Sequence, residues 1–334
     1  MKSLTRFALT SWFVLSLLVY GSVLVSPKWV AYSALVSVGV PIIVVANLLL
    51  LIAAAIMKTT KAFYFLVLLL IAIPFINVGI SFSGNDDLEE DGLKILNYNV
   101  KFFVDARKDN YSGIISWINA EDPDIICFQE FQPQTSLVER IRKNGNYEEA
   151  IFKDRSNLVI YSKYPILDKG LLLKDSELNN ILYADINVNG DTIRVYSAHL
   201  ESMGINPDKI QNPDGIRHEY ESVKMKFLRA SNSRTEQIDR MLVHAENSPY
   251  PVFIAGDFND VPFSYNYFKI RRKYSNAFEK KGKGLGVTYN GKIPYLRIDN
   301  QFFSDSFKPK AFRTINNVYF SDHFPVIGIY EISR

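Results

Sequence analysis

Several short apolar runs in the C-terminal three quarters of the chain end in a polar side chain that can take part in hydrolysis. These side chains are Asn99, Glu130, His199, Asp257 with Asn259, Asp299, and Asp322 with His323. A single Asp or Asn at the end of a strand is usually a turn former. Six such ends in one region are a stronger signal, because carboxylates, amides and imidazoles bind metal ions and transfer protons.

Taken one at a time, some of these residues have a structural explanation. Asn99 or Asp322 alone would serve as a strand-end cap, and His199 alone as a hydrogen-bonded core histidine. Glu130 is harder to explain in this way, because a buried carboxylate without a partner is costly. The sequence therefore favours a functional role most clearly for Glu130.

Alternating strands and amphipathic helices are expected to position these residues. We predict strands at 93–100, 124–131, 147–152, 158–161, 181–188, 192–199, 252–255, 298–303, 311–316 and 325–332. We predict helices at 112–120, 133–143, 220–245 and 265–274. Asn189-Gly190 between two alternating apolar runs is a strong hairpin signal. The pattern predicts an α/β fold in which two largely antiparallel sheets pack face to face with helices outside.

The charged residues divide the chain into two unlike parts. All 35 Asp and Glu residues follow position 85, whereas five of the 38 Lys and Arg residues precede it. That leaves 33 basic against 35 acidic residues in the C-terminal part, a net charge near −2. A strongly cationic nucleic-acid-binding domain is therefore not indicated. The single cysteine, Cys127, excludes an intramolecular disulfide and is expected to be a small core residue.

Three apolar segments precede the acidic part, at about 7–25, 29–57 and 62–80. Each meets the requirement of about 20 residues for crossing a bilayer. The second is long and contains Pro41, so we expect it to be tilted or kinked there. Three such runs without an acidic residue favour transmembrane helices over buried helices of a soluble protein.

Loop charges predict the orientation of these helices. Lys2 and Arg6 precede the first segment, and Lys58 and Lys61 lie in the second loop, so both regions are expected in the cytoplasm. Three crossings then place the remainder outside, in the periplasm of a Gram-negative cell. Cleavage of the first segment as a signal peptide would leave that orientation unchanged. We predict an anchor at 1–82, a linker at 83–92 and a catalytic domain at 93–334.

The polar residues also belong to six motifs that follow one another in a familiar order. The motifs are Asn97-Tyr-Asn-Val, Phe128-Gln-Glu, Ser197-Ala-His-Leu, Gly256-Asp-Phe-Asn, Arg297-Ile-Asp and Ser321-Asp-His-Phe-Pro. Together they resemble the endonuclease/exonuclease/phosphatase superfamily of deoxyribonuclease-like metal-dependent phosphoesterases, here as a membrane-anchored bacterial-type member. The resemblance covers about 240 residues. It implies a four-layer α/β sandwich.

The resemblance also implies a metal site. It assigns Glu130 as the principal Mg²⁺ ligand, with Asn99 beside it and Asp322 in the metal or phosphate network; Mn²⁺ is an alternative ion. Oxygen ligands combined with several waters are the usual surroundings of protein-bound Mg²⁺. The ion is expected to neutralise the phosphate oxygens and the leaving oxygen.

Five further residues receive catalytic roles from the resemblance. Asp257 orients or deprotonates the attacking water, and Asn259 holds the phosphate or the nucleophile. Asp299 fixes the tautomer and orientation of His323 in a His–carboxylate pair. His199 donates to a non-bridging phosphate oxygen.

Some segments depart from the family pattern or lie outside its motifs. Asn300 and Gln301 stand where the family usually has an aromatic and an aliphatic residue, which predicts a register shift or a looser strand. Residues 201–216 are an insertion expected to overhang the site. The basic stretch 271–283 is interpreted as a solvated face, with a phosphate- or headgroup-binding rim as the alternative. His218 and His244 are expected at the surface of a helix.

These observations predict a metal-dependent hydrolase of phosphate esters, either a phosphodiesterase or a nuclease, acting outside the cytoplasm. The expected partners are the lipid bilayer and a phosphate ester, which is a nucleic acid, a lipid headgroup or a small molecule; no protein partner is evident. The near-neutral domain disfavours a processive binder of duplex DNA. A lipid headgroup phosphodiesterase and an inactive membrane-tethered binding module are the alternatives. Transport is disfavoured because the apolar segments lack acidic residues.

Overall fold

The structure is a computed structural model of the chain. It describes residues 2–84, 91–104, 106, 111–132, 135–152, 156–173, 178–204, 213–291 and 293–333. Most of the linker predicted at 83–92 and half of the predicted insertion at 201–216 lie outside the described residues.

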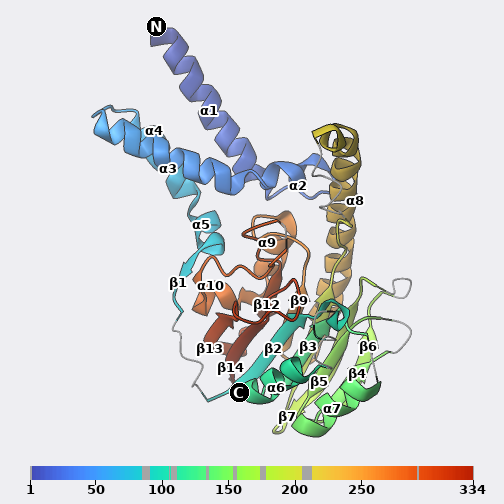
Figure 1. Ribbon diagram of the computed structural model, residues 1–334. Coiled ribbons are helices and arrows are strands. Elements are labelled where there is room, and N and C mark those ends of the chain that lie inside the picture. The colour runs from blue at the N-terminus through green and yellow to red at the C-terminus, as the bar shows by residue number, and fades with distance from the viewer. Residues whose placement is uncertain are drawn as a thin grey trace.

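Two six-stranded sheets form the centre of the domain (Figure 1). The first sheet has the order β13 (Phe307–Thr314), β14 (Val326–Ile332), β2 (Leu93–Asn99), β3 (Ile125–Gln129), β5 (Val159–Ser162), β4 (Glu148–Ile151). The second has the order β10 (Ser275–Asn276), β12 (Asp299–Phe303), β9 (Val252–Asp257), β8 (Asp191–His199), β7 (Ile181–Val188), β6 (Ile166–Leu171). Only the middle pair of each sheet is parallel, β2 with β3 and β8 with β9. The prediction of two largely antiparallel sheets is confirmed.

Three apolar clusters hold four layers together. Residues such as Ile95, Cys127 and Val195 fill the space between the two sheets. Their neighbours Leu96 and Tyr196 point to the opposite faces, because side chains alternate along a strand. The outer face of the first sheet packs on α6 (Ser112–Glu121) and α7 (Thr135–Gly145). The outer face of the second packs on α8 (Pro213–Glu246) and α9 (Tyr265–Arg271). The predicted four-layer α/β sandwich is confirmed.

The predicted disturbance at Asn300 and Gln301 is wrong. Strand β12 pairs with β9 in unbroken register, from Asp299 opposite Asp257 to Phe303 opposite Phe253. Gln301 is accommodated because it donates to the carbonyl of Ile95 and accepts from the hydroxyl of Tyr330, both in the other sheet. These two hydrogen bonds to the other sheet thus satisfy a polar side chain at a position where the family usually has an apolar one.

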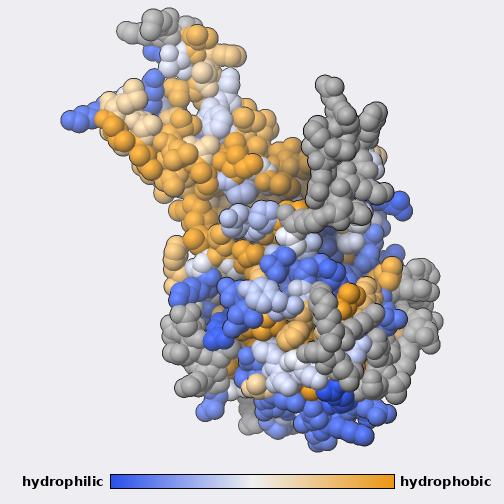
Figure 2. Space-filling view, viewed as in Figure 1, coloured by the Kyte–Doolittle hydropathy of each residue, from blue (hydrophilic) through white to orange (hydrophobic). Residues whose placement is uncertain are grey.

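The N-terminal part consists of α1 (Lys2–Ser22), α2 (Tyr32–Ser37), α3 (Val40–Ile56), α4 (Ala62–Ile71) and α5 (Ile73–Gly79). Among the described residues, 4–22 and 32–56 form helices long and apolar enough to cross a membrane. The pair α4 and α5 makes a third candidate if the two helices, bent by 58°, count as one span. The chain breaks between α2 and α3 and again between α4 and α5. In each case the second helix has a proline in its first turn, and a proline cannot continue the preceding helix. Figure 2 shows apolar surface gathered over these helices.

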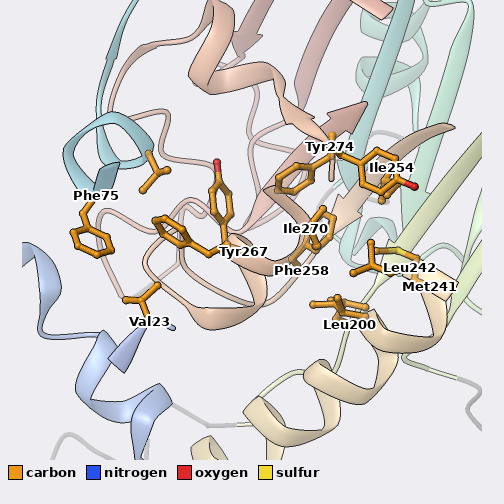
Figure 3. Close-up of a cluster of buried hydrophobic side chains, with 14 of the residues drawn as sticks. Val23, Phe75, Leu200, Met241, Leu242, Ile254, Phe258, Tyr267, Ile270 and Tyr274 are labelled. Carbon is orange, nitrogen blue, oxygen red and sulfur yellow. The ribbon is translucent and has the colours of Figure 1, made fainter. Parts of the chain in front are cut away.

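The N-terminal helices pack on the domain at α8 and α9. Phe75 of α5 lies against Phe268, with ring centroids 5.5 Å apart, and Val23 belongs to the same buried cluster (Figure 3). Lys28, between α1 and α2, pairs with Asp239 of α8 at 2.9 Å. The short loop after α1 therefore contacts the domain directly.

Candidate active site

The carboxyl ends of the four central strands meet at one edge of the sandwich. Asn99 ends β2, Glu130 follows β3, His199 ends β8 and Asp257 ends β9. Both middle pairs are parallel, so the two members of each pair deliver their last residues to the same edge. Asn99 donates from Nδ2 to Asp257 Oδ2 at 2.9 Å, which joins the two sheets at this edge. This contact builds the site across the interface of the sandwich.

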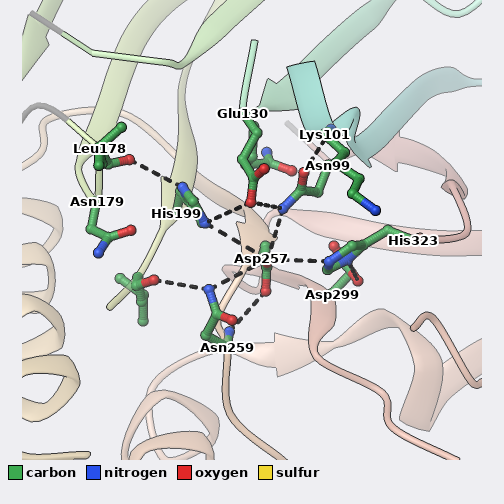
Figure 4. A network of polar contacts seen from close by, with 12 residues as sticks. Asn99, Lys101, Glu130, Leu178, Asn179, His199, Asp257, Asn259, Asp299 and His323 are labelled. Carbon is green, nitrogen blue, oxygen red and sulfur yellow. Dashed lines mark hydrogen bonds and ion pairs between the residues drawn. The ribbon is translucent and has the colours of Figure 1, made fainter. Parts of the chain in front are cut away.

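Asp257 is the centre of the polar network in Figure 4. Its Oδ1 accepts from the backbone N–H of Asn259 at 2.8 Å. The Nε2 atoms of His323 and His199 lie 3.7 and 3.9 Å from its Oδ2. The carboxylate is 1% exposed. Two imidazoles and two amides thus surround one buried carboxylate.

The backbone around this carboxylate is tightly constrained. A Cβ at Gly256 would lie 2.1 Å from the carbonyl oxygen of Ala198, so only glycine lets β8 and β9 approach this closely. Glu130 and Asn259 both adopt positive φ angles, 48° and 50°. Such left-handed backbone at non-glycine residues is uncommon and often occurs at functional sites.

His199 is oriented by a backbone contact. Its Nδ1 lies 3.1 Å from the carbonyl oxygen of Leu178, so Nδ1 carries a proton and donates it. Its Nε2 faces Oε1 of Glu130 at 3.6 Å. The ring therefore presents Nε2 to the space between Glu130 and Asp257.

His323 and Asp299 form the predicted His–carboxylate pair, with Nδ1 and Oδ2 separated by 2.8 Å. Burial raises the pKa of Asp299 to about 6. Burial alone would lower the pKa of His323, but the charges of Asp299 and Asp257 outweigh it and raise that pKa to about 10. His323 is therefore an imidazolium at neutral pH, with Nε2 directed at Asp257.

The Glu130 carboxylate fits one ligand of a hard divalent cation, because it is a quarter exposed and water can complete a coordination shell. Asn99 presents its amide nitrogen to this carboxylate, with Nδ2 donating to Oε1 at 3.2 Å, while its Oδ1 accepts from the backbone N–H of Lys101. Asp257, Asp299 and His323 also place ligand atoms within 4.8 Å of one another. In that group, His323 Nδ1 and Asp299 Oδ2 are already bonded to each other.

Seven of the eight predicted site residues come together in this network. Asp322 lies beside it and pairs with Lys101 at 3.0 Å. Sequence reasoning missed Lys101, whose place follows only from the turn after β2. It also missed Thr288, whose hydroxyl accepts from the N–H of Asp299, and Tyr289, whose ring lies edge-on to His323. Both come from a loop without a motif.

Other predicted features concern residues outside the network. In the basic stretch, Arg271 donates from Nε to both carboxylate oxygens of Glu279. The expectation that His244 is a surface residue is wrong. It is half-buried, and its Nδ1 lies 2.8 Å from the hydroxyl of Tyr196 because the ring packs between α8 and the sheet. The side chain of His218 lies outside the described residues. Cys127 is fully buried, as predicted.

Two family models match the chain. The model of the endonuclease/exonuclease/phosphatase family matches residues 96–323. A model of a domain of unknown function matches residues 2–79, which include all five N-terminal helices. A comparison with curated proteins gave no match.

Solved structures with the same fold include proteins of different activity. D. rerio TDP2 in complex with a single-strand DNA product is 20% identical, with 72% of this chain and 100% of that chain covered and a TM-score of 0.54. A mannosyl-6-phosphatase of Bacteroides thetaiotaomicron is 18% identical, with 72% and 100% covered and a TM-score of 0.52. The human Nocturnin catalytic domain with bound sulfate is 15% identical, with 74% and 96% covered and a TM-score of 0.53. These similarities show the fold.

Proposed function

The chain belongs to the endonuclease/exonuclease/phosphatase family, and we propose that it is a Mg²⁺-dependent phosphodiesterase acting on the extracytoplasmic side of a membrane. The observation that carries this proposal is the position of Asp257. A buried carboxylate with the Nε2 atoms of two histidines within 4 Å is suited to taking a proton from water next to a phosphate. The phosphate would be held by those same rings.

In the proposed reaction, the oxygen of a water forms a bond to phosphorus while the bond to the leaving oxygen breaks. Asp257 takes a proton from that water, and Asn259 holds the carboxylate in place through its backbone N–H. The leaving oxygen ends as an alcohol after gaining a proton. Water and a phosphodiester thus give a phosphomonoester and an alcohol.

The two histidines have different tasks in this proposal. His199 would donate from Nε2 to a non-bridging oxygen, which requires a proton on both ring nitrogens because Nδ1 already donates to the Leu178 carbonyl. His323 stays positively charged at neutral pH because Asp299 and Asp257 raise its pKa. It therefore stabilises the negative charge that grows on the phosphoryl oxygens.

Glu130 and Asn99 would hold Mg²⁺, or Mn²⁺ in its place, and Asp322, which pairs with Lys101, would act in the metal or phosphate network. The ion would supply charge neutralisation at the phosphate and the leaving oxygen. The Glu130 carboxylate, which is a quarter exposed to water, supports this assignment. Asn99 would turn its amide to present Oδ1, which here accepts from the backbone N–H of Lys101.

The test uses the full-length chain in lipid nanodiscs with methyl p-nitrophenyl phosphate as substrate. We expect hydrolysis with Mg²⁺ and none with a chelator. Glu130→Gln should raise the Mg²⁺ concentration needed for half-maximal rate by about tenfold or more, as expected for loss of a ligand. Glu139→Gln, on the exposed face of α7, is the matched control and should behave as wild type. An unaltered Mg²⁺ requirement in Glu130→Gln would contradict the metal assignment.

Sidedness is tested separately with single cysteines, because buried Cys127 gives little background reaction. Lys308→Cys lies on an exposed part of the domain, and Thr60→Cys lies in the loop between α3 and α4. A membrane-impermeant maleimide added to intact cells, or to spheroplasts for a periplasmic domain, should label Lys308→Cys and spare Thr60→Cys. The reverse pattern would place the domain in the cytoplasm.

A further inference from the structure

A groove of about 360 Å³ runs from the catalytic residues to the N-terminal helices. Asn259, Tyr289 and His323 line one end of it. Val38, in the turn between α2 and α3, lines the other end. The volume falls within the range of about 300–1,000 Å³ usual for ligand pockets. The groove therefore connects the catalytic residues, where the phosphate would react, to the segment predicted to lie in the membrane.

The wall between these two ends is mainly apolar. It is formed by Met203, Phe227, Val261, Ile293, Leu296 and Ile298. Ile293 and Val38 are 42% and 43% exposed, so this apolar surface is not covered by the described part of the chain. An open apolar surface that begins at catalytic residues is typical of a binding site for an apolar part of the substrate.

The charge of the groove disfavours a nucleic acid strand. Among the described lining residues, Arg234 is the one with a permanent positive charge. It is buried, lies 3.4 Å from Asp260 and donates to the carbonyl of Glu201. Its charge is therefore already compensated. A groove that follows a nucleic acid backbone needs several open cations.

The groove adjoins a predicted membrane span at Val38. Val38 belongs to the 25-residue segment 32–56, which is long and apolar enough to span. Trp29, just before it, and Tyr32, its first residue, are 85% and 52% exposed. Exposed Trp and Tyr at the start of a span are typical of the membrane–water interface. Figure 1 shows α2 beside α8.

We propose that the groove receives a hydrocarbon chain of a membrane lipid whose phosphodiester lies at Asp257 and His323. This inference rests on the proposed function and names the substrate class of the same site. Water attacks the phosphorus, the bond to one ester oxygen breaks, and that oxygen leaves as an alcohol. One product keeps the hydrocarbon chain and stays in the bilayer, while the other enters the water.

The test compares p-nitrophenyl alkyl phosphates with methyl, butyl, hexyl and octyl chains on the full-length protein in nanodiscs. Burial of a methylene contributes enough to raise kcat/KM about fourfold. We expect kcat/KM to rise by about this factor per methylene until the chain fills the groove. Ile293→Glu and Phe227→Glu place a charge in the wall and should flatten this dependence, while hydrolysis of the methyl ester stays within about twofold of wild type.

The matched control is Leu167→Glu, an exposed leucine of β6 outside the groove, which should keep the wild-type chain-length dependence. A chain-length dependence that survives in both groove variants would overturn the inference, because partition into the nanodisc would then explain it. A flat dependence in wild type, with the methyl ester still cleaved, would also overturn it and leave the proposed function intact. No cleavage of any ester would overturn the proposed function itself.

Vesicles of phosphatidylethanolamine and phosphatidylglycerol supply the second measurement. We expect the protein to release a water-soluble headgroup product from them, and Ile293→Glu to lower that rate at least tenfold more than Leu167→Glu does. Equal effects of the two variants would contradict a role of the groove in lipid binding.

Discussion

The catalytic edge and the N-terminal helices differ in which side chains they bury: the edge buries polar side chains, and the helices leave apolar ones exposed. At the edge, Asp257, Asp299 and His323 are almost fully buried, and hydrogen bonds hold each of them. In the helices, large apolar side chains such as Phe7, Ile56 and Phe63 are mostly exposed. The edge is thus organised by the protein itself, whereas the helices require an apolar environment to cover them. Substitutions in the two regions should therefore act on different observables.

The largest effect is expected at the centre of the edge. Asp257→Asn keeps the shape of the side chain but removes the proton acceptor and the charge facing both histidines. We expect kcat to fall by about 10³-fold or more with little change in thermal stability. Steady-state kinetics and thermal unfolding measure the two effects. Asp305→Asn, at an exposed position, is the control. A loss of less than tenfold would be incompatible with a catalytic base at this position.

Asp299→Asn should lower kcat by about 10²-fold, since His323 loses the carboxylate that orients it. It should also change the pH profile. Asp299 raises the pKa of His323, so its removal lowers that pKa, and the imidazolium loses its proton at a lower pH. In the pH profile of kcat, we expect the decrease on the alkaline side to begin at a lower pH than in wild type. An alkaline limb that stays in place would show that His323 is not the group titrating there.

The two regions also differ in how far the sequence predicts them. Asp257 and His323 were predictable because their roles need fixed residue types within short motifs. Thr288 and Tyr289 were not, since their contacts with Asp299 and His323 depend on the path of a loop. Composition predicts the apolar helices but not their packing. Nothing in the residues around Val38 indicates that this turn lines the catalytic groove, because that contact joins segments far apart in the sequence.

The same limit applies inside the sheets. The polar pair Asn300 and Gln301 predicted a register shift or a looser strand because the family usually has an aromatic and an aliphatic residue there. In the fold, Gln301 is buried and bonded to Ile95 and Tyr330 of the opposite sheet, and β12 keeps its register. Whether a buried polar side chain disturbs or stabilises a strand depends on partners that come from distant segments.

An intermediate effect is expected where the two regions meet. Arg297 is buried, donates to the carbonyl of Val78 at the end of α5 and lies over the ring of Phe278. Arg297→Met leaves that carbonyl without its donor, which costs about 1–3 kcal/mol of unfolding free energy. Thermal unfolding in nanodiscs measures this loss. Because Arg297 also precedes Asp299 by two residues, kcat should be followed as well. A change confined to kcat would contradict a stabilising role at the junction.

The smallest effect is expected from the second contact of the junction. Lys28 pairs with Asp239, but both side chains are about one-third exposed, so solvent screens the pair. Lys28→Met should change the free energy of unfolding by less than about 1 kcal/mol.

The aromatic contact of Phe75 with Phe268 is buried, so Phe75→Ala should cost several times more, about 3–5 kcal/mol. The ratio of these two losses distinguishes a junction held by apolar packing from one held by charge. Because packing is not screened by salt, the loss in Phe75→Ala should stay the same at high ionic strength, while the small loss in Lys28→Met should disappear.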